Sequence, residues 1–199
     1  MTGTDETGID RLVAAAKAGD SEAFGAIFDA YHDGVYRYIA SRVGRPSDAE
    51  DLTQVVFVKA LEALPRYEAR GIPFGGWLYR LARNTVIDHT RTRRQHVELE
   101  ALSERPDEGA GPEDLAAARQ EVEAVGAALA ELTDEQRDAI ALRFFAGLSA
   151  REAAIAMGKQ EGTIRGLQFR GIAALRRRLG LEEPPRPTGT PPMERQHDE

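Results

Sequence analysis

One stretch near the C-terminus, residues 148–178, constrains the fold of this chain more than any other. Its sequence, LSAREAAIAMGKQEGTIRGLQFRGIAALRRR, contains a capping box formed by Ser149 and Glu152, and Gly158 stands where a helix C-cap is expected. A second helix is expected to begin near Glu161, with apolar residues at helical spacing along one face. Two short helices joined by a glycine-containing turn predict a helix-turn-helix.

The charge of this stretch separates a DNA-binding motif from an ordinary helical hairpin with solvated arginines. Between Arg143 and Arg178 the basic residues far outnumber the acids, although the whole chain carries a formal net charge of −7. A local excess of positive charge in an acidic protein is typical of a surface that contacts phosphates. We therefore interpret the stretch as a DNA-binding helix-turn-helix.

The composition of the chain excludes several classes of protein. It contains no cysteine, which excludes disulfides, cysteine-based zinc sites and thiol catalysis. No apolar run approaches the length of a membrane span, and the acidic N-terminus lacks the hydrophobic segment of a signal peptide. We therefore expect a soluble cytoplasmic protein without membrane insertion.

Helical periodicity runs through the chain, and no segment shows the alternation typical of strands. Ser47 with Glu50, and Thr133 with Gln136, are predicted to form further capping boxes. From the start and stop signals we expect helices over residues 9–18, 21–43, 47–64, 75–94, 113–132, 133–145, 149–157 and 161–178.

The composition changes at His96, where a stretch rich in acids, proline and glycine begins, as is typical of a linker. The predicted fold class is all-α, with two small helical domains joined by a flexible acidic linker, the C-terminal one being the helix-turn-helix. The predicted parts are a disordered N-terminus (1–8), a first domain (9–95), the linker (96–112), a second domain (113–180) and a disordered proline-rich tail (181–199).

The first domain also ends in a basic helix. Between residues 76 and 95 the single acid, Asp88, is outnumbered by Arg80, Arg83, Arg91, Arg93 and Arg94. Two separated basic helices predict two separated contacts on one nucleic acid. Trp77 in this helix shares its side with Leu78 and Leu81, which favours a place in the core over base stacking.

Four segments carry motifs that belong together. They are DAEDLTQVVFVKAL (48–61), PFGGWLYRLARNTVIDHTRTRR (73–94), LTDEQRDAIALRFFAGLSAREAAIAM (132–157) and GTIRGLQFR (162–170). In this order they resemble a bacterial RNA polymerase sigma factor of the small extracytoplasmic-function (ECF) type. The resemblance implies that 9–95 is sigma region 2 and 113–180 is sigma region 4. It implies a protein that binds core RNA polymerase, directs it to the −35 and −10 promoter elements and opens the −10 region. It further implies no catalysis, no cofactor, no metal, and an anti-sigma factor as a further partner.

The resemblance also implies which residues make the contacts. Core polymerase would be bound by Asp48, Asp51, Gln54 and Lys59, the −10 element by Arg80, Arg83, Asn84 and Arg91, and the −35 element by Arg143, Arg165, Gly166, Phe169 and Arg170. These residue types suit the roles, because asparagine offers a donor and an acceptor, arginine holds phosphate or reads guanine, and phenylalanine contacts a thymine methyl. The chain departs from the usual family pattern at Val55, where an acid is common, and at Leu167 and Gln168.

Three alternatives remain open at this point. The acids of the linker suit either a solubilising spacer or, as the family implies, a nucleic-acid mimic that enters the polymerase cleft. A helix-turn-helix regulator that never engages core polymerase is a second possible function, but it would not need the motif at 48–61. A helical enzyme with a metal at Asp29, His32 and Asp33 is a third, and it lacks a second cluster of ligands.

Overall fold

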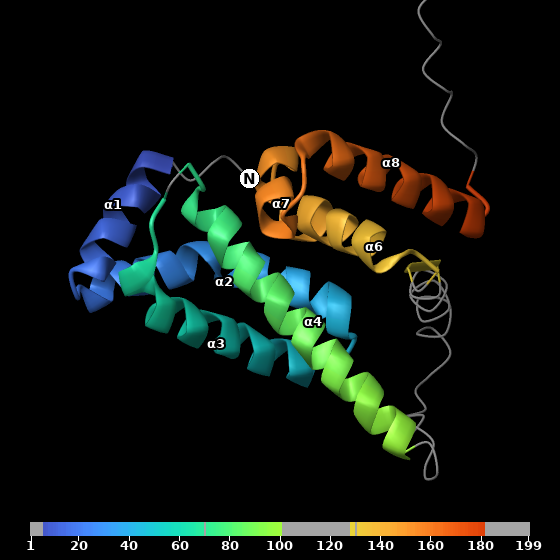
Figure 1. Ribbon diagram of the computed structural model, residues 1–199, viewed down its shortest axis with the longest axis horizontal. Helices are drawn as coiled ribbons and strands as arrows, with labels where there is room; N and C mark the ends of the chain where they lie inside the picture. Colours follow the sequence, from blue (N-terminus) through green and yellow to red (C-terminus); the bar gives the residue numbers. More distant parts are fainter. Residues whose placement is uncertain (1–5, 70, 101–127, 130, 182–199) are drawn as a thin grey trace, which may run out of the picture.

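The structure, a computed structural model, describes residues 6–69, 71–100, 128–129 and 131–181. Within these ranges every regular element is helical, which confirms the all-α fold class (Figure 1). In chain order the elements are α1 (Glu6–Lys17), α2 (Ser21–Val43), α3 (Pro46–Ala63), the 3₁₀ turn η1 (Leu64–Arg66), α4 (Phe74–Glu100), α6 (Asp134–Ile140), the π-helical turn η2 (Ala141–Phe145), α7 (Ala150–Met157) and α8 (Glu161–Arg178).

The ends of most helices follow local signals in the sequence. Asp20 caps α2 by accepting two backbone N–H hydrogen bonds, and Gly44 ends the helix with a φ of 77°. Thr133 and Ser149 form the capping boxes predicted for α6 and α7. The helix-turn-helix stretch therefore folds as its capping residues predict.

The start of α3 differs from the prediction. The helix begins at Pro46, and the N-cap residue Arg45 makes no side-chain capping bond, so the predicted capping box at Ser47 is wrong. Proline is favoured at the first helical position, because no N–H is needed there and its φ already suits a helix.

The end of α4 also differs, because the helix continues to Glu100 instead of ending at residue 94. Residues 95–100 contain no proline or glycine to stop it. The first part of the predicted linker is therefore helical. Residues 101–112, most of the predicted helix 113–132, residues 1–5 and the tail from 182 lie outside the described residues.

The N-terminal half, residues 6–100, is a bundle in which each helix packs against its neighbour in the sequence. α1 lies against α2, α2 against α3, and α3 against α4, while α4 also returns to α2. Its centre is apolar, and Ile27, Val35, Val56, Leu78 and Val86 are completely buried or nearly so. The apolar positions that repeat at helical spacing in the sequence supply this core.

An aromatic cluster fixes the entrance to α4. The ring of Phe74 lies 5.7 Å from that of Tyr31, 5.6 Å from Tyr67 and 5.3 Å from Trp77, measured between centroids. Phe74 itself is 2% exposed. Trp77 packs against the core, as its apolar neighbours predicted.

The C-terminal half, residues 128–181, is the helix-turn-helix with α6 and η2 packed against it. Ile164, Leu167 and Gly171 are the buried residues of α8. A Cβ added at Gly171 would lie 2.7 Å from Cδ1 of Ile140, so a larger residue there would require the end of the Ile140 side chain to move. The helix predicted over 133–145 widens at η2, where the N–H of Ala146 donates to the carbonyl of Ala141 at 3.1 Å.

The two halves lie directly against each other. In Figure 1 α7 lies beside the start of α4, against which it packs, and η2, which continues α6, packs on α2. Their apolar side chains form one continuous core that includes Leu78 and Ala82 from one half and Leu142 and Ala153 from the other. Nothing in the periodicity of the sequence predicted this contact.

Candidate nucleic-acid interface

The exposed face of α8 forms one wall of an open groove, and the start of α7 forms the other. The groove is lined by Arg143, Arg151, Arg165, Gln168 and Phe169 among others. The side chain of Arg165 is 71% exposed and is held to Glu161 by an ion pair of 2.5 Å. The phenyl ring of Phe169 is presented to solvent, with the residue 63% exposed. Cations beside an exposed apolar ring suit both the phosphates and the base edges of a DNA groove.

Arg143 has a different position from the other arginines of this surface. Its Nε donates to Oε1 of Gln168 at 3.1 Å and its Nη1 donates to the carbonyl of Leu148. The guanidinium therefore ties η2 to α8 while it still lines the groove. Of the other predicted −35 residues, Gly166 and Arg170 lie beside each other on α8, because a Cβ at Gly166 would be 3.3 Å from Nη1 of Arg170.

The second basic helix, α4, has its predicted residues on two sides. Three of them are exposed, namely Arg80, Asn84 and Arg91. They are separated by four and then seven residues, so they lie on one face of the helix. Arg83 instead turns toward the C-terminal half and is mostly buried there. The structure therefore groups three of the four predicted −10 residues and separates the fourth.

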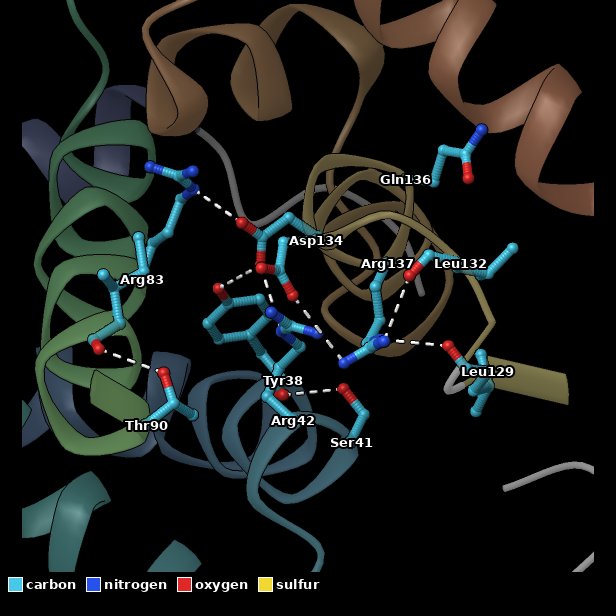
Figure 2. A network of polar contacts seen from close by, with 12 residues as sticks. Tyr38, Ser41, Arg42, Arg83, Thr90, Leu129, Leu132, Asp134, Gln136 and Arg137 are labelled. Carbon is cyan, nitrogen blue, oxygen red and sulfur yellow. Dashed lines mark hydrogen bonds and ion pairs between the residues drawn. The ribbon is translucent and has the colours of Figure 1, made fainter. Parts of the chain in front are cut away.

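A buried carboxylate from α6 receives Arg83 and joins the two halves. Nε of Arg83 donates to Oδ2 of Asp138 at 2.8 Å, and the hydroxyl of Tyr38 donates to Oδ1 at 3.2 Å. Nε of Arg42 lies 3.0 Å from the same Oδ1. Figure 2 shows Tyr38 and Arg42 from α2 and Arg83 from α4 converging at this point. We call these four residues the Asp138 cluster.

The Asp138 cluster is almost completely shielded from solvent. The side chain of Asp138 is 2% exposed and that of Arg42 is 6% exposed. Burial, followed by the nearby charge of Asp138, raises the pKa of Tyr38 well above its ordinary value. The hydroxyl therefore stays protonated and remains a hydrogen-bond donor to the carboxylate.

The solvent-facing side of α3 carries two of the four predicted polymerase-binding residues. Asp51 and Gln54 are exposed there, beside the exposed apolar side chains of Val55, Val58 and Leu61. The other two residues turn toward α4. Asp48 pairs with Arg93 at 3.3 Å and with His89 at 3.7 Å, and Lys59 donates to Thr85 Oγ1 at 3.1 Å.

Comparison with known proteins identifies the family of the chain. Family models for sigma-70 region 2 and for sigma-70 region 4 match residues 27–96 and 128–177. The chain is 38% identical over 178 residues to the ECF RNA polymerase sigma factor BldN of Streptomyces coelicolor, which covers 88% of this chain and 67% of BldN. It is 35% identical over 186 residues to ShbA of Streptomyces griseus, another ECF sigma factor. This match covers 88% of this chain and 97% of ShbA. The chain belongs to the ECF RNA polymerase sigma factors.

Solved ECF-type structures share the fold of this sigma factor. CnrH, solved in complex with the cytosolic domain of CnrY, superposes with a TM-score of 0.68 at 26% identity, covering 87% of this chain and 97% of CnrH. The sigma factor RpoE of Bartonella quintana superposes with a TM-score of 0.64 at 24% identity. This match covers 80% of this chain and 98% of RpoE. The second match shows likeness of fold alone.

As an ECF sigma factor, the chain is a transcription initiation factor that binds core RNA polymerase and directs it to promoter DNA. The matches lend no support to the alternative of a regulator that never engages polymerase.

Among the residues that the structure describes, none of the helices is long and apolar enough to cross a membrane. His32, considered in the sequence as a metal ligand, lies with Nδ1 3.2 Å from Asp33 and its ring 4.8 Å from that of Phe28.

The sequence-based list of contact residues missed Arg151 and three members of the Asp138 cluster, namely Tyr38, Arg42 and Asp138. Arg151 follows the N-cap Ser149 by two positions, so its place at the mouth of the groove could have been found from the capping box. Asp138 gave a weaker signal. It stands four residues before the buried Leu142 on the apolar face of α6, where an acid needs a partner.

Proposed function

We propose that residues 9–95 of this sigma factor bind core polymerase and the −10 element, and that residues 113–180 bind the −35 element. The observation that supports this division is that each half presents its own basic helix, α4 in one and α8 in the other, with exposed arginines on both. The protein has no catalysis of its own and acts in the cytoplasm, where its polymerase is. Run-off transcription with core polymerase on a library of promoters tests the proposal and also identifies the promoter.

At the polymerase, Asp51 and Gln54 make direct contacts, and Asp48 and Lys59 hold α3 in place on α4. This division is supported by the exposure of the first pair and by the side-chain contacts of the second. The apolar side chains of Val58 and Leu61 extend the same surface. An exposed apolar patch with charged neighbours is suited to a protein partner.

Reversing the charge at Asp51 is expected to weaken binding to core polymerase about tenfold or more, which is about 1.4 kcal/mol. The reason is that Asp51→Arg places a like charge where a basic partner is met, while the exposed position leaves the fold intact. Asp29→Arg is the matched control, because it makes the same change at an exposed acid of α2. Titration of labelled sigma factor with core, with helicity checked by circular dichroism, measures the effect. Equal affinities of the two variants would remove Asp51 from the interface.

At the −10 element, Asn84 hydrogen-bonds the edge of an unstacked base, and Arg80, Arg83 and Arg91 hold the backbone. Asn84 is exposed on α4, and an amide can satisfy both a donor and an acceptor of a base. At the −35 element, α8 enters the major groove with Arg165 and Phe169 on base edges. Arg143, Gly166 and Arg170 shape the rest of that surface.

Asn84→Ala is expected to leave closed-complex formation nearly unchanged and to reduce melting of the −10 element. Loss of the hydrogen bonds to the flipped base removes about 1–3 kcal/mol from the open complex, whereas duplex binding depends on phosphate contacts elsewhere. Permanganate footprinting measures the melted fraction, and filter binding measures the closed complex. Gln160→Ala, which truncates an exposed amide on the other half, is the control. Melting equal to that of the control would show that Asn84 is not at the base.

We further propose a protein partner of the anti-sigma class for this chain. The similar structure of CnrH was solved with the cytosolic domain of CnrY bound. The exposed apolar side chains of α3 give this chain a surface on which such a partner could compete with polymerase.

A further inference from the structure

One of the predicted −35 residues, Arg143, is held in its place by a side chain of α8. Nε of Arg143 donates to Oε1 of Gln168 at 3.1 Å, and Nη1 donates to the carbonyl of Leu148. Both Arg143 and Gln168 line the groove between α8 and the start of α7. A guanidinium has several further N–H donors. The two bonds therefore fix its plane and leave the remaining donors for a ligand in the groove.

Gln168 lies on the part of α8 that is proposed to contact bases. It follows Arg165 by three residues and directly precedes Phe169, and all three side chains line the groove. Arg143 comes from η2, 25 residues earlier in the chain. Its bond to Gln168 therefore adds a second guanidinium to the groove that already contains Arg165.

The bond to Arg143 also determines how the amide of Gln168 is oriented. A guanidinium donates hydrogen bonds but cannot accept them, so the atom of Gln168 that faces Arg143 must be its oxygen. Among the contacts that the structure describes, the amide nitrogen Nε2 has no partner in the chain. Its N–H groups are therefore available to a ligand in the groove.

This orientation changes the base that a glutamine would read on its own. A free glutamine contacts adenine through its oxygen and its nitrogen, which must both point at the same base edge. Here the oxygen is held by Arg143, so the two side chains together offer only N–H donors to the groove. In the major groove guanine presents two acceptors, whereas adenine and cytosine each present an amino group that would meet another donor.

We propose that Arg143 and Gln168 act as one unit that reads guanine at a position of the −35 element, in which Gln168 orients Arg143 and donates to the same base. The inference rests on the proposed −35 site of α8 and deepens it. Position 168 is one at which the chain departs from the usual family pattern. A side chain without an oxygen there would leave Nε of Arg143 without this acceptor.

A double-mutant cycle tests whether the two residues act as one unit. Binding of the full chain with core polymerase to promoter DNA is measured for Arg143→Ala, Gln168→Ala and the double variant. Each single variant is expected to bind about tenfold more weakly, and the double variant no more weakly than either, because each side chain needs the other. In the control pair, Gln168→Ala with Arg177→Ala, the losses should multiply, because Arg177 lies away from the groove. Losses that also multiply for Arg143 and Gln168 would overturn the unit.

The base preference gives a readout that a purely structural contact would not change. The same complexes are tested on promoters that carry each of the four bases at every −35 position. In Arg143→Ala the oxygen of Gln168 is released, so the preference at one position is expected to change from guanine to adenine.

Gln168→Glu provides a second test in which the bond between Arg143 and Leu148 is kept. Glutamate still accepts from Arg143 but replaces the N–H donors by an oxygen, so a base with an amino group, adenine or cytosine, should gain at the same position. An unchanged order of the four bases in both variants, with wild-type helicity by circular dichroism, would overturn the proposal. A wild type without a preference for guanine at any −35 position would overturn it as well.

These results also distinguish the unit from the −35 assignment itself. If Arg165→Ala relaxes the base preference while the variants at Arg143 and Gln168 leave it unchanged, α8 reads the −35 element and the unit fails. If the variants at all three positions bind every −35 sequence as the wild type does, the assignment of α8 to the −35 element fails, and the unit fails with it.

Discussion

Replacing Phe74 by alanine is expected to lower the free energy of unfolding by about 3–5 kcal/mol, because a fully packed aromatic side chain is lost and its cavity remains. Phe74 is 2% exposed and contacts the rings of Tyr31, Tyr67 and Trp77 at the entrance to α4. Truncation also loosens the segment that joins η1 to α4. We therefore expect promoter opening to fall together with stability.

Urea denaturation followed by tryptophan fluorescence measures the effect of Phe74→Ala directly. Trp77 is the only tryptophan of the chain, and its ring lies 5.3 Å from that of Phe74, so the signal comes from the cluster itself. Phe144→Ala is the control, because it removes the same side chain where the residue is 58% exposed, and its effect should stay within about 0.5 kcal/mol. A loss below about 1 kcal/mol for Phe74→Ala would contradict the packing described here.

The second large effect is expected at the −35 element. Arg165→Ala should weaken the free energy of DNA binding by about 1–3 kcal/mol and relax the base preference at one position of the element. Arg165 and Phe169 are four residues apart on the exposed face of α8, opposite the buried Ile164 and Leu167. If α8 lies in the major groove, the two side chains reach neighbouring base pairs. The ion pair with Glu161 is exposed and weak, so it yields readily to a base or phosphate.

Arg177→Ala is the matched variant for this experiment. Arg177 is exposed near the end of α8, away from the groove. Its loss should weaken binding to all DNA sequences by the same factor and reduce the salt dependence of binding by about one phosphate contact. Binding of both variants to a set of single-base −35 mutants at two salt concentrations distinguishes the roles. If both variants lose the same affinity for every DNA sequence, α8 contacts only the DNA backbone and does not read bases.

Local features of the fold were predictable because local chemistry determines them. Ser149, Gly158 and Thr133 cap helices through groups within a few residues, so the helix-turn-helix could be placed from sequence. The start of α3 was predicted wrongly because two signals compete there, a proline at the first position and a serine one residue later. The proline decided the outcome, since it needs no capping partner.

Contacts between distant parts of the chain could not be predicted in the same way. Asp138 lies 100 residues from Tyr38 and 55 from Arg83, and no periodicity connects positions so far apart. The same limit applies to α3, where Asp48 and Lys59 matched the family pattern but are turned toward α4. Spacing along one helix identified Asp51 and Gln54 as neighbours but could not show which side chains a second helix would cover.

The packing of each early helix against its neighbour in the sequence has a consequence for synthesis on the ribosome. Such local contacts form quickly, so α1 to α4 can fold while the rest of the chain is still being made. The 55 residues between Arg83 and Asp138 take roughly 3–11 s to add at about 5–20 residues per second. For that interval Arg42 and Arg83 have no carboxylate from α6 to bind. Every new molecule therefore passes first through a state in which the contact between the two halves has not yet formed.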